Sequence, residues 1–197
     1  MKNKIKNIIS FNGDHGSGKS TIAKKLANSL KYERFYMGKI FREMAKEESV
    51  SYSEFLDLLK KDSSYDKKID KYVVELSDKN DNFVIESRTA WHFIPDSFKI
   101  YLKVSENEGA ERMFADYLEN DHRKVEGKDI KTKEDILKIS RHRKKSDDKR
   151  YKNLYNINTN DMSQYDLVLD TTELRKDEVY KVVERAVRKF INKNNEE

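Results

Sequence analysis

Short apolar runs recur along the chain and predict β-strands. Residues 8–11, 83–85 and 167–169 are such runs, each bounded by polar or turn-forming residues. Residues 98–104 instead alternate between apolar and polar positions, which predicts a strand with one half-covered face nearer an edge of the sheet. The chain is therefore expected to build its core around a sheet of short strands.

Between these strands, apolar residues three or four positions apart predict amphipathic helices. Two of the helices begin with a serine, Ser53 and Ser64, which is expected to cap the helix. The expected helices cover residues 19–30, 38–45, 53–60, 64–76, 110–118 and 174–190.

Strands that alternate with helices indicate an α/β fold with a mainly parallel sheet covered on both faces. Ligands of such sheets bind beyond the carboxyl ends of the strands. Site residues are therefore expected just after strands or in the segment 120–160, which is polar, basic and mostly helical by propensity. Because this segment has few apolar residues, we expect a mobile flap rather than part of the core.

The composition narrows the class of protein. Of the 197 residues, 39% are charged and 36% hydrophobic, which is typical of a helix-rich globular protein. The absence of cysteine excludes disulfides, thiolate metal sites and cysteine nucleophiles. No apolar run is long enough to span a membrane, and residues 1–4 lead into a strand rather than a signal segment, so we expect a cytoplasmic protein without a membrane partner.

The net charge of +5 is concentrated in one place. Residues 141–150 contain six cations and two anions, which accounts for nearly the whole excess. An extended nucleic-acid surface needs a longer basic track, so nucleic acid is not expected as a partner. A concentrated charge of this kind suits a small phosphate-bearing ligand.

Residues 13–20 match G-x-x-x-x-G-K-[ST], the phosphate-binding P-loop, between a predicted strand and a predicted helix. Glycines let backbone N–H groups approach phosphate oxygens, and the helix N-terminus adds its positive dipole end. Lys19 is expected to reach the β- and γ-phosphates and the Ser20 hydroxyl to bind Mg²⁺. The residues expected to bind a nucleoside triphosphate are Gly13, Asp14, His15, Gly16, Ser17, Gly18, Lys19, Ser20 and Thr21.

Four arginines fall near expected strand ends or in the basic flap. Arg42 lies one turn into a helix, and Arg88 follows the strand at 83–85. Arg143 and Arg150 flank Asp147 at spacings of four and three, so all three side chains can share one helical face. Several guanidinium groups together with a P-loop lysine exceed what one triphosphate needs, which indicates a second anionic substrate.

The chain resembles the cytidylate kinases, especially their archaeal-type branch. The resemblance rests on motifs that occur in order across nearly the whole chain, namely the P-loop, Gly38-Lys39-Ile40-Phe41-Arg42, Ile85-Glu86-Ser87-Arg88-Thr89-Ala90-Trp91, Lys149-Arg150-Tyr151 and Tyr165-Asp166-Leu167-Val168-Leu169-Asp170-Thr171.

The resemblance implies transfer of the ATP γ-phosphate to CMP, with dCMP left open as a second acceptor, giving CDP and ADP. Arg42 would bind the monophosphate and Arg88 would help place CMP. In the flap, Asp147 and Arg150 would read cytosine and Arg143 would meet phosphate. The implied catalytic residues are Lys19, Arg42, Arg88, Arg143 and Arg150, and the implied substrate-binding residues are Gly38, Arg42, Arg88, Asp147 and Arg150.

The resemblance also implies that Glu86 orients Mg²⁺ or its waters, which makes Ser20 and Glu86 the expected metal residues. The chain departs from the family pattern at four positions. Asp14 and His15 stand where the family often has small residues or proline; we expect the Asp14 carboxylate to point away from phosphate and His15 to face solvent. Met37 removes a contact with the base, and Gly109 removes a cation near the phosphates.

The expected fold is a P-loop NTPase, a three-layer α/β/α sandwich with a five-stranded, mainly parallel sheet. We expect one kinase domain over residues 1–197, with a helical insertion at 37–78 that binds the nucleoside monophosphate and a helical basic lid at 120–160. A monomer that binds only small nucleotides is expected.

Two other functions stay open from the sequence. One is a different P-loop kinase, acting on AMP, UMP or a small metabolite such as shikimate. The other is a nucleotide-dependent RNA-binding or regulatory protein, which the basic flap and the unusual P-loop allow.

Overall fold

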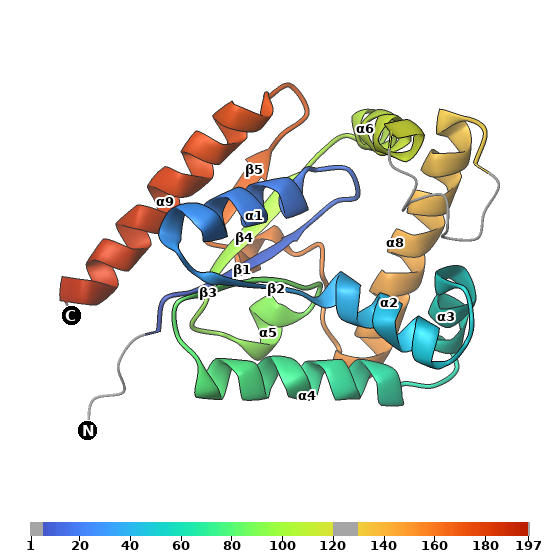
Figure 1. Cartoon of the computed structure of the whole chain (residues 1–197), viewed down its shortest axis with the longest axis horizontal. Helices are drawn as coiled ribbons and strands as arrows, with labels where there is room; N and C mark the ends of the chain where they lie inside the picture. The colour runs from blue at the N-terminus through green and yellow to red at the C-terminus, as the bar shows by residue number, and fades with distance from the viewer. Residues whose placement is uncertain (1–5, 120–129, 197) are drawn as a thin grey trace.

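In a computed structural model of the chain, residues 6–119 and 130–196 are described (Figure 1). Five parallel strands form one sheet in the order β2-β3-β1-β4-β5. The strands are β1 (Ile8–Gly13), β2 (Glu33–Tyr36), β3 (Phe83–Glu86), β4 (Phe98–Lys103) and β5 (Leu167–Asp170). The predicted three-layer P-loop NTPase fold is confirmed.

Helices cover both faces of the sheet, as Figure 1 shows, with α1 and α9 on one face and α4 and α5 on the other. A 3₁₀ turn at Met162–Gln164 precedes β5. The helices are α1 (Lys19–Leu30), α2 (Met37–Glu47), α3 (Tyr52–Leu58), α4 (Ser64–Lys79), α5 (Ala90–Phe93), α6 (Glu106–Glu119), α8 (Lys133–Tyr155) and α9 (Lys176–Glu196).

Alternate residues of the central strand β1 point into two separate cores. Ile9 and Phe11 pack with the apolar stripes of α1 and α9. Ile8 faces the other way and packs with residues of α2, α3 and α4, including the fully buried Phe55 and Val73. Since the side chains of a strand alternate between its two faces, one short strand can join both layers of helices.

The prediction that 98–104 forms a half-covered strand nearer an edge is confirmed in part, since β4 lies next to the edge strand β5 and Lys103 is exposed. β4 pairs with both β1 and β5, and Tyr101, on the face expected to be open, is buried. Its ring packs against Tyr165 in a third core cluster, so a large amphipathic side chain closes part of the face that the lysines beside it suggested was exposed.

The capping serines also differ from the prediction. Ser51, not Ser53, caps α3: its hydroxyl accepts from the Glu54 N–H while the Glu54 side chain accepts from the Ser51 N–H. Such a capping box needs a serine followed three residues later by a glutamate, a pattern that begins at Ser51. Ser64 lies inside the first turn of α4.

The segment expected to be a flap without core contacts is partly packed. Residues 120–129 lie outside the described part of the chain. Beyond them, the end of α8 joins the third core cluster, where Tyr151 and Ile157 are buried with Trp91. Tyr155 on the same helix donates a hydrogen bond to Asp70 on α4. The expectation failed because tyrosines, polar by composition, bury most of their surface here.

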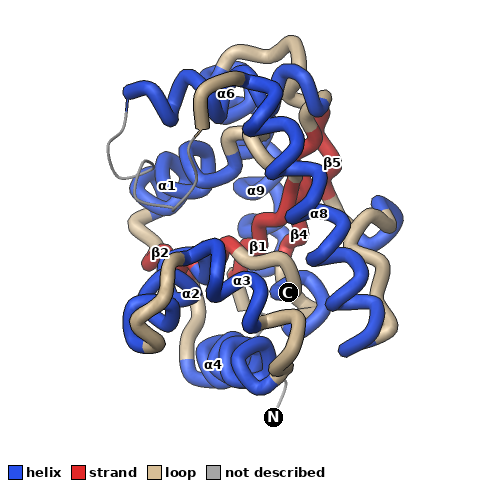
Figure 2. Tube along the Cα trace, turned by 90° about the vertical axis from the view of Figure 1, so that its right-hand side faces the viewer, coloured by secondary structure: helices blue, strands red, loops and turns tan. Residues whose placement is uncertain are grey.

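Figures 1 and 2 both place α2, α3 and α8 on the same side of the molecule, and α6 packs against the first part of α8. Ion pairs join these two helices, between Arg141 and Glu106 at 2.8 Å and between Lys133 and Glu111 at 3.0 Å. No helix in the described ranges is long and apolar enough to cross a membrane.

Candidate functional site

The P-loop connects the end of β1 to the beginning of α1. Gly18 is the residue that precedes α1, and its φ of 81° is left-handed, a conformation that glycine adopts without strain. No acidic side chain lies in the first turn of α1, so the positive end of the helix dipole is available to an anion. This geometry fits a phosphate group held by backbone N–H donors.

Two glycines let the P-loop lie directly against α6. A β-carbon on Gly16 would collide with the backbone of Gly109, and one on Gly109 would lie 2.5 Å from the His15 carbonyl oxygen. The sequence indicated only that Gly109 removes a cation. The structure adds a reason for the glycine, since any side chain at this position would push α6 away from the loop.

Ser20 and Glu86 lie together, as the proposed magnesium site requires. The Ser20 hydroxyl donates to Glu86 Oε2 at 2.6 Å, and Arg34 donates to Glu86 Oε1 at 2.7 Å. A hydroxyl and a carboxylate are oxygen ligands that suit Mg²⁺, which usually binds one or two protein groups together with substrate phosphates. These residues therefore fit the ion, and Arg34, which the sequence analysis missed, holds the carboxylate in place.

Lys19 lies in a strongly positive environment. Its Nζ donates to the Asp14 carbonyl oxygen at 3.3 Å. Burial, followed by the charge of Arg88, lowers the pKa of Lys19 to about 7. Negative phosphate oxygens at this position would stabilise the charged ammonium group and raise its pKa again, so the loop favours a polyanion.

Arg88 extends from the loop after β3 toward the P-loop. Its Nη1 donates to the Gly13 carbonyl oxygen at 2.8 Å, and its Nε lies 3.7 Å from Asp147 Oδ2 on α8. Arg88 is thus in contact with both the loop expected to hold ATP and the helix expected to hold CMP.

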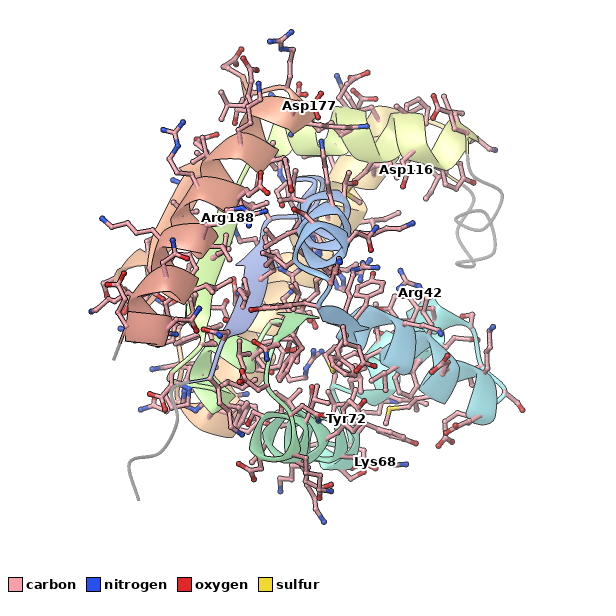
Figure 3. All side chains as sticks on the ribbon, turned by 60° about the vertical axis from the view of Figure 1, so that its left-hand side comes forward. Arg42, Lys68, Tyr72, Asp116, Asp177 and Arg188 are labelled. Atoms are coloured by element: carbon pink, nitrogen blue, oxygen red, sulfur yellow. The ribbon has the colours of Figure 1, made fainter. Side chains whose placement is uncertain are left out.

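On the side of the insertion, Tyr52 joins two of the expected arginines. Arg42 projects from α2, donates to the Gly38 carbonyl oxygen at 2.9 Å and lies 4.9 Å from the Tyr52 ring centre (Figure 3). Arg143 on α8 lies 5.4 Å from the same ring centre. An aromatic ring attracts cations to its face, so Tyr52 brings the guanidinium groups of two distant segments together.

Arg150 is held by two carboxylates inside the protein. Its Nη2 lies 3.1 Å from Asp147 Oδ1, and its Nε lies 3.1 Å from Oδ2 of Asp66 on α4. Burial raises the pKa of Asp66 to about 6. The sequence analysis missed Asp66, although its place in line with the buried Ile69 and Val73 of α4 was a signal that could have found it.

A cavity lies between α3 and α8, beside these arginines. It is lined by Tyr52, Ser53, Leu56, Arg143, Asp147 and Arg150, among others. Cationic, acidic and aromatic groups therefore face one space, which can accommodate an anionic ligand with a polar ring.

The two unusual P-loop residues turn toward α8 and β4. The Asp14 carboxylate accepts from the Tyr101 hydroxyl at 2.9 Å and from Lys144 Nζ at 2.8 Å. His15 is half-buried and its ring contacts Ser140 and Arg88, so the expectation that it faces solvent is wrong. The sequence alone could not predict these contacts, because the residues of α8 that pack against the loop lie more than 120 positions further along the chain.

The fold and the P-loop are those of a P-loop phosphotransferase, and a cavity lined by arginines and a carboxylate lies between α3 and α8. The model of the Cytidylate kinase-like family matches residues 8–173. The chain belongs to this family, and the resemblance stated from its motifs is confirmed.

Two relatives support this assignment, and a solved structure supports the fold. A cytidylate kinase of Pyrococcus horikoshii is 35% identical over 185 residues, covering 93% of this chain and 90% of that protein. A cytidylate kinase of Methanocaldococcus jannaschii is 34% identical over 181 residues, covering 91% and 97%. A shikimate kinase of Bacteroides thetaiotaomicron, 13% identical, has a TM-score of 0.61 and covers 94% of this chain and 98% of its own, which supports the fold alone.

Proposed function

We propose that this protein transfers the γ-phosphate of ATP to CMP, giving CDP and ADP, with dCMP as a further acceptor to be tested. The observation that carries the proposal is the cavity between α3 and α8, where Arg143, Asp147 and Arg150 line one wall and Tyr52 the other. Membership of the Cytidylate kinase-like family supports the choice of acceptor.

In the proposed reaction the protein binds and orients the two substrates and neutralises the charge of their phosphates. Lys19 and the backbone N–H groups of the P-loop would hold the triphosphate, and Arg42, Arg88 and Arg143 would bind the acceptor phosphate and the transferred group. The attacking phosphate oxygen is already anionic at neutral pH, so no general base is needed. Positioning and fixed positive charge then account for catalysis.

Mg²⁺, held by Ser20 and Glu86 together with phosphate oxygens, would neutralise charge on the phosphates. Arg34, through its contact with Glu86, would keep the carboxylate directed toward the Ser20 hydroxyl. Packing of α8 against the P-loop would exclude water, which would otherwise compete with CMP for the phosphoryl group.

Asp147 and Arg150 are the residues that we propose to read the base. A carboxylate can accept from the 4-amino group of cytosine, and a guanidinium can donate to its carbonyl oxygen or ring nitrogen. We further propose that residues 37–78 act as the monophosphate-binding insertion and 120–160 as the lid of one domain, in a cytoplasmic monomer without a nucleic-acid partner.

A panel of acceptors tests the proposed function directly. With ATP and Mg²⁺, we expect kcat/KM for CMP to exceed that for AMP and UMP by at least about tenfold, since one good base contact is worth about 1–3 kcal/mol. Coupled measurement of ADP formation follows each acceptor, dCMP and shikimate included. Equal turnover of CMP, AMP and UMP would contradict base reading, and salt-sensitive RNA binding without any transfer would favour the RNA-binding alternative.

Replacement of Asp147 tests its role in the choice of acceptor. We expect Asp147→Ala to raise KM for CMP about 10- to 100-fold while KM for ATP changes by less than about threefold, because the lost contacts belong to the acceptor. The matched control is Asp148→Ala, since Asp148 accepts hydrogen bonds from Thr159 and Asn160 and would lower stability without this selectivity. Equal losses for ATP and CMP would show that Asp147 is only a structural ion-pair residue.

A further inference from the structure

The two P-loop residues that set this loop apart both contact helix α8. His15 Nδ1 lies 2.9 Å from Ser140 Oγ, and Asp14 accepts from Lys144 at 2.8 Å. Ser140 and Lys144 are four residues apart, so they lie one turn apart on one face of α8. The P-loop, which is expected to bind the donor, therefore contacts α8, the helix of the proposed acceptor site, through two neighbouring side chains.

The other edge of the His15 ring faces Arg88. Arg88 Nη2 lies 2.5 Å from His15 Nε2. A guanidinium group can only donate hydrogen bonds, so Nε2 must accept and the ring must carry its proton on Nδ1. The Nδ1–H group then donates a hydrogen bond to the Ser140 hydroxyl oxygen. These two contacts fix a neutral ring in one tautomer.

The charges around His15 favour this neutral form. The nearest carboxylates are already paired, Asp14 with Lys144 and Asp147 with both Arg88 and Arg150. Burial lowers the pKa of His15 well below its usual range, and nearby cations lower it further. In order of effect, those cations are Arg88, Arg143, Lys19 and Lys144.

Four acceptors surround the Arg88 guanidinium, and the weakest hydrogen bond is that to Asn12 Oδ1 on β1, at 3.5 Å. Two others belong to the P-loop, the Gly13 carbonyl oxygen at 2.8 Å and His15 Nε2 at 2.5 Å. The fourth is Asp147 on α8, at 3.7 Å. The direction of this arginine is therefore set mostly by the loop and only in part by the helix.

We propose that the His15 side chain is a positioning residue that directs Arg88 toward the acceptor phosphate and links this arginine to α8. The P-loop would then bind the donor through its backbone and Lys19, and act on the acceptor through the His15 side chain. The inference rests on the proposed function, in which Arg88 helps place CMP.

Two substitutions of His15 test its contact with Arg88 and its contact with Ser140 separately. His15→Gln keeps an acceptor near the position of Nε2 and loses the contact with Ser140, whereas His15→Asn keeps a donor near Nδ1 and loses the contact with Arg88. We expect His15→Asn to raise KM for CMP about 10- to 100-fold with KM for ATP changed less than about threefold. His15→Gln should restore KM for CMP to within about fivefold of the wild type.

The outcome is decided by the acceptor KM of the two variants beside an active wild-type enzyme. Equal losses in both variants, or no loss in His15→Asn, would overturn the positioning role. If His15→Asn fails to fold by its melting curve, Ser140→Ala provides the second test, with an expected rise of a few-fold in KM for CMP alone, and an unchanged KM would overturn the proposal. A wild type that leaves CMP unphosphorylated would instead refute the proposed function.

Discussion

Lys19→Met is expected to abolish phosphoryl transfer, with a fall in kcat of on the order of a thousandfold for every acceptor, because a buried cation that neutralises transition-state charge is lost. Methionine is nearly as long as lysine and carries no charge, so the P-loop should keep its shape. Coupled measurement of ADP formation gives the loss. Retention of more than about a tenth of the wild-type kcat would contradict the role of Lys19.

The same lysine should make ATP binding depend on protons. Since burial and Arg88 lower the pKa of Lys19 to about 7, most of the wild type has a neutral Lys19 at pH 8. Phosphate oxygens raise that pKa, so ATP binding at pH 8 should take up nearly one proton, measured by calorimetry in buffers of different ionisation enthalpy. Lys19→Met serves as the control and should show little or no uptake.

The lowered pKa also predicts the effect on stability. A lysine whose folded pKa lies below its unfolded value opposes folding when protonated, and this penalty is complete below about pH 7 and disappears above about pH 10. Lys19→Met removes the penalty, so the nucleotide-free variant should melt above the wild type at pH 7, with the difference shrinking toward pH 10. A higher melting temperature beside lost activity is the expected stability–function trade-off.

The sequence predicted the fold well because its signals were local. The P-loop pattern, the apolar runs at 8–11 and 83–85, and the helical spacing after them each depend on neighbours in the chain. The strand at 98–104 was predicted, but the burial of Tyr101 on its polar face was not, because only the distant partners of Tyr101 show that this part of the face is covered.

The candidate site was less predictable because its contacts cross long stretches of chain. Motif residues such as Arg88 and Asp147 were found from the sequence, and the structure brings them together. Tyr52 gave no local sign of holding two arginines, and Gly109 showed an absent cation but not the backbone contact that its lack of a side chain permits. Asp66 was missed because an acid on a helix is usually solvated.

Asp66 and Arg150 combine a cost in stability with a proposed role in function. Their side chains are only 2% and 8% exposed. The pKa of Asp66, raised by burial to about 6, means that ionisation of this carboxylate opposes folding. Its contribution to stability is therefore highest below about pH 4, falls as the pH rises to about 6, and stays at the lower level above it.

Removal of Asp66 alone should destabilise the protein more than removal of Asp66 and Arg150 together. We expect Asp66→Leu to lower the free energy of unfolding by about 2 kcal/mol at pH 7.5, because Arg150 keeps its charge with Asp147 as its remaining carboxylate. The double variant Asp66→Leu with Arg150→Met should be at least as stable as the wild type, since apolar groups often replace a buried ion pair without loss. Urea unfolding followed by circular dichroism measures both.

We expect the double variant to regain stability without regaining affinity for CMP. If Arg150 reads the base, the double variant should keep KM for CMP raised at least about tenfold while its melting temperature matches or exceeds that of the wild type. Such a split assigns the ion pair to substrate recognition, held at a cost in folding free energy. A double variant that is both stable and fully active would instead show that Arg150 serves only to neutralise Asp66, and cytosine recognition would then fall to Asp147.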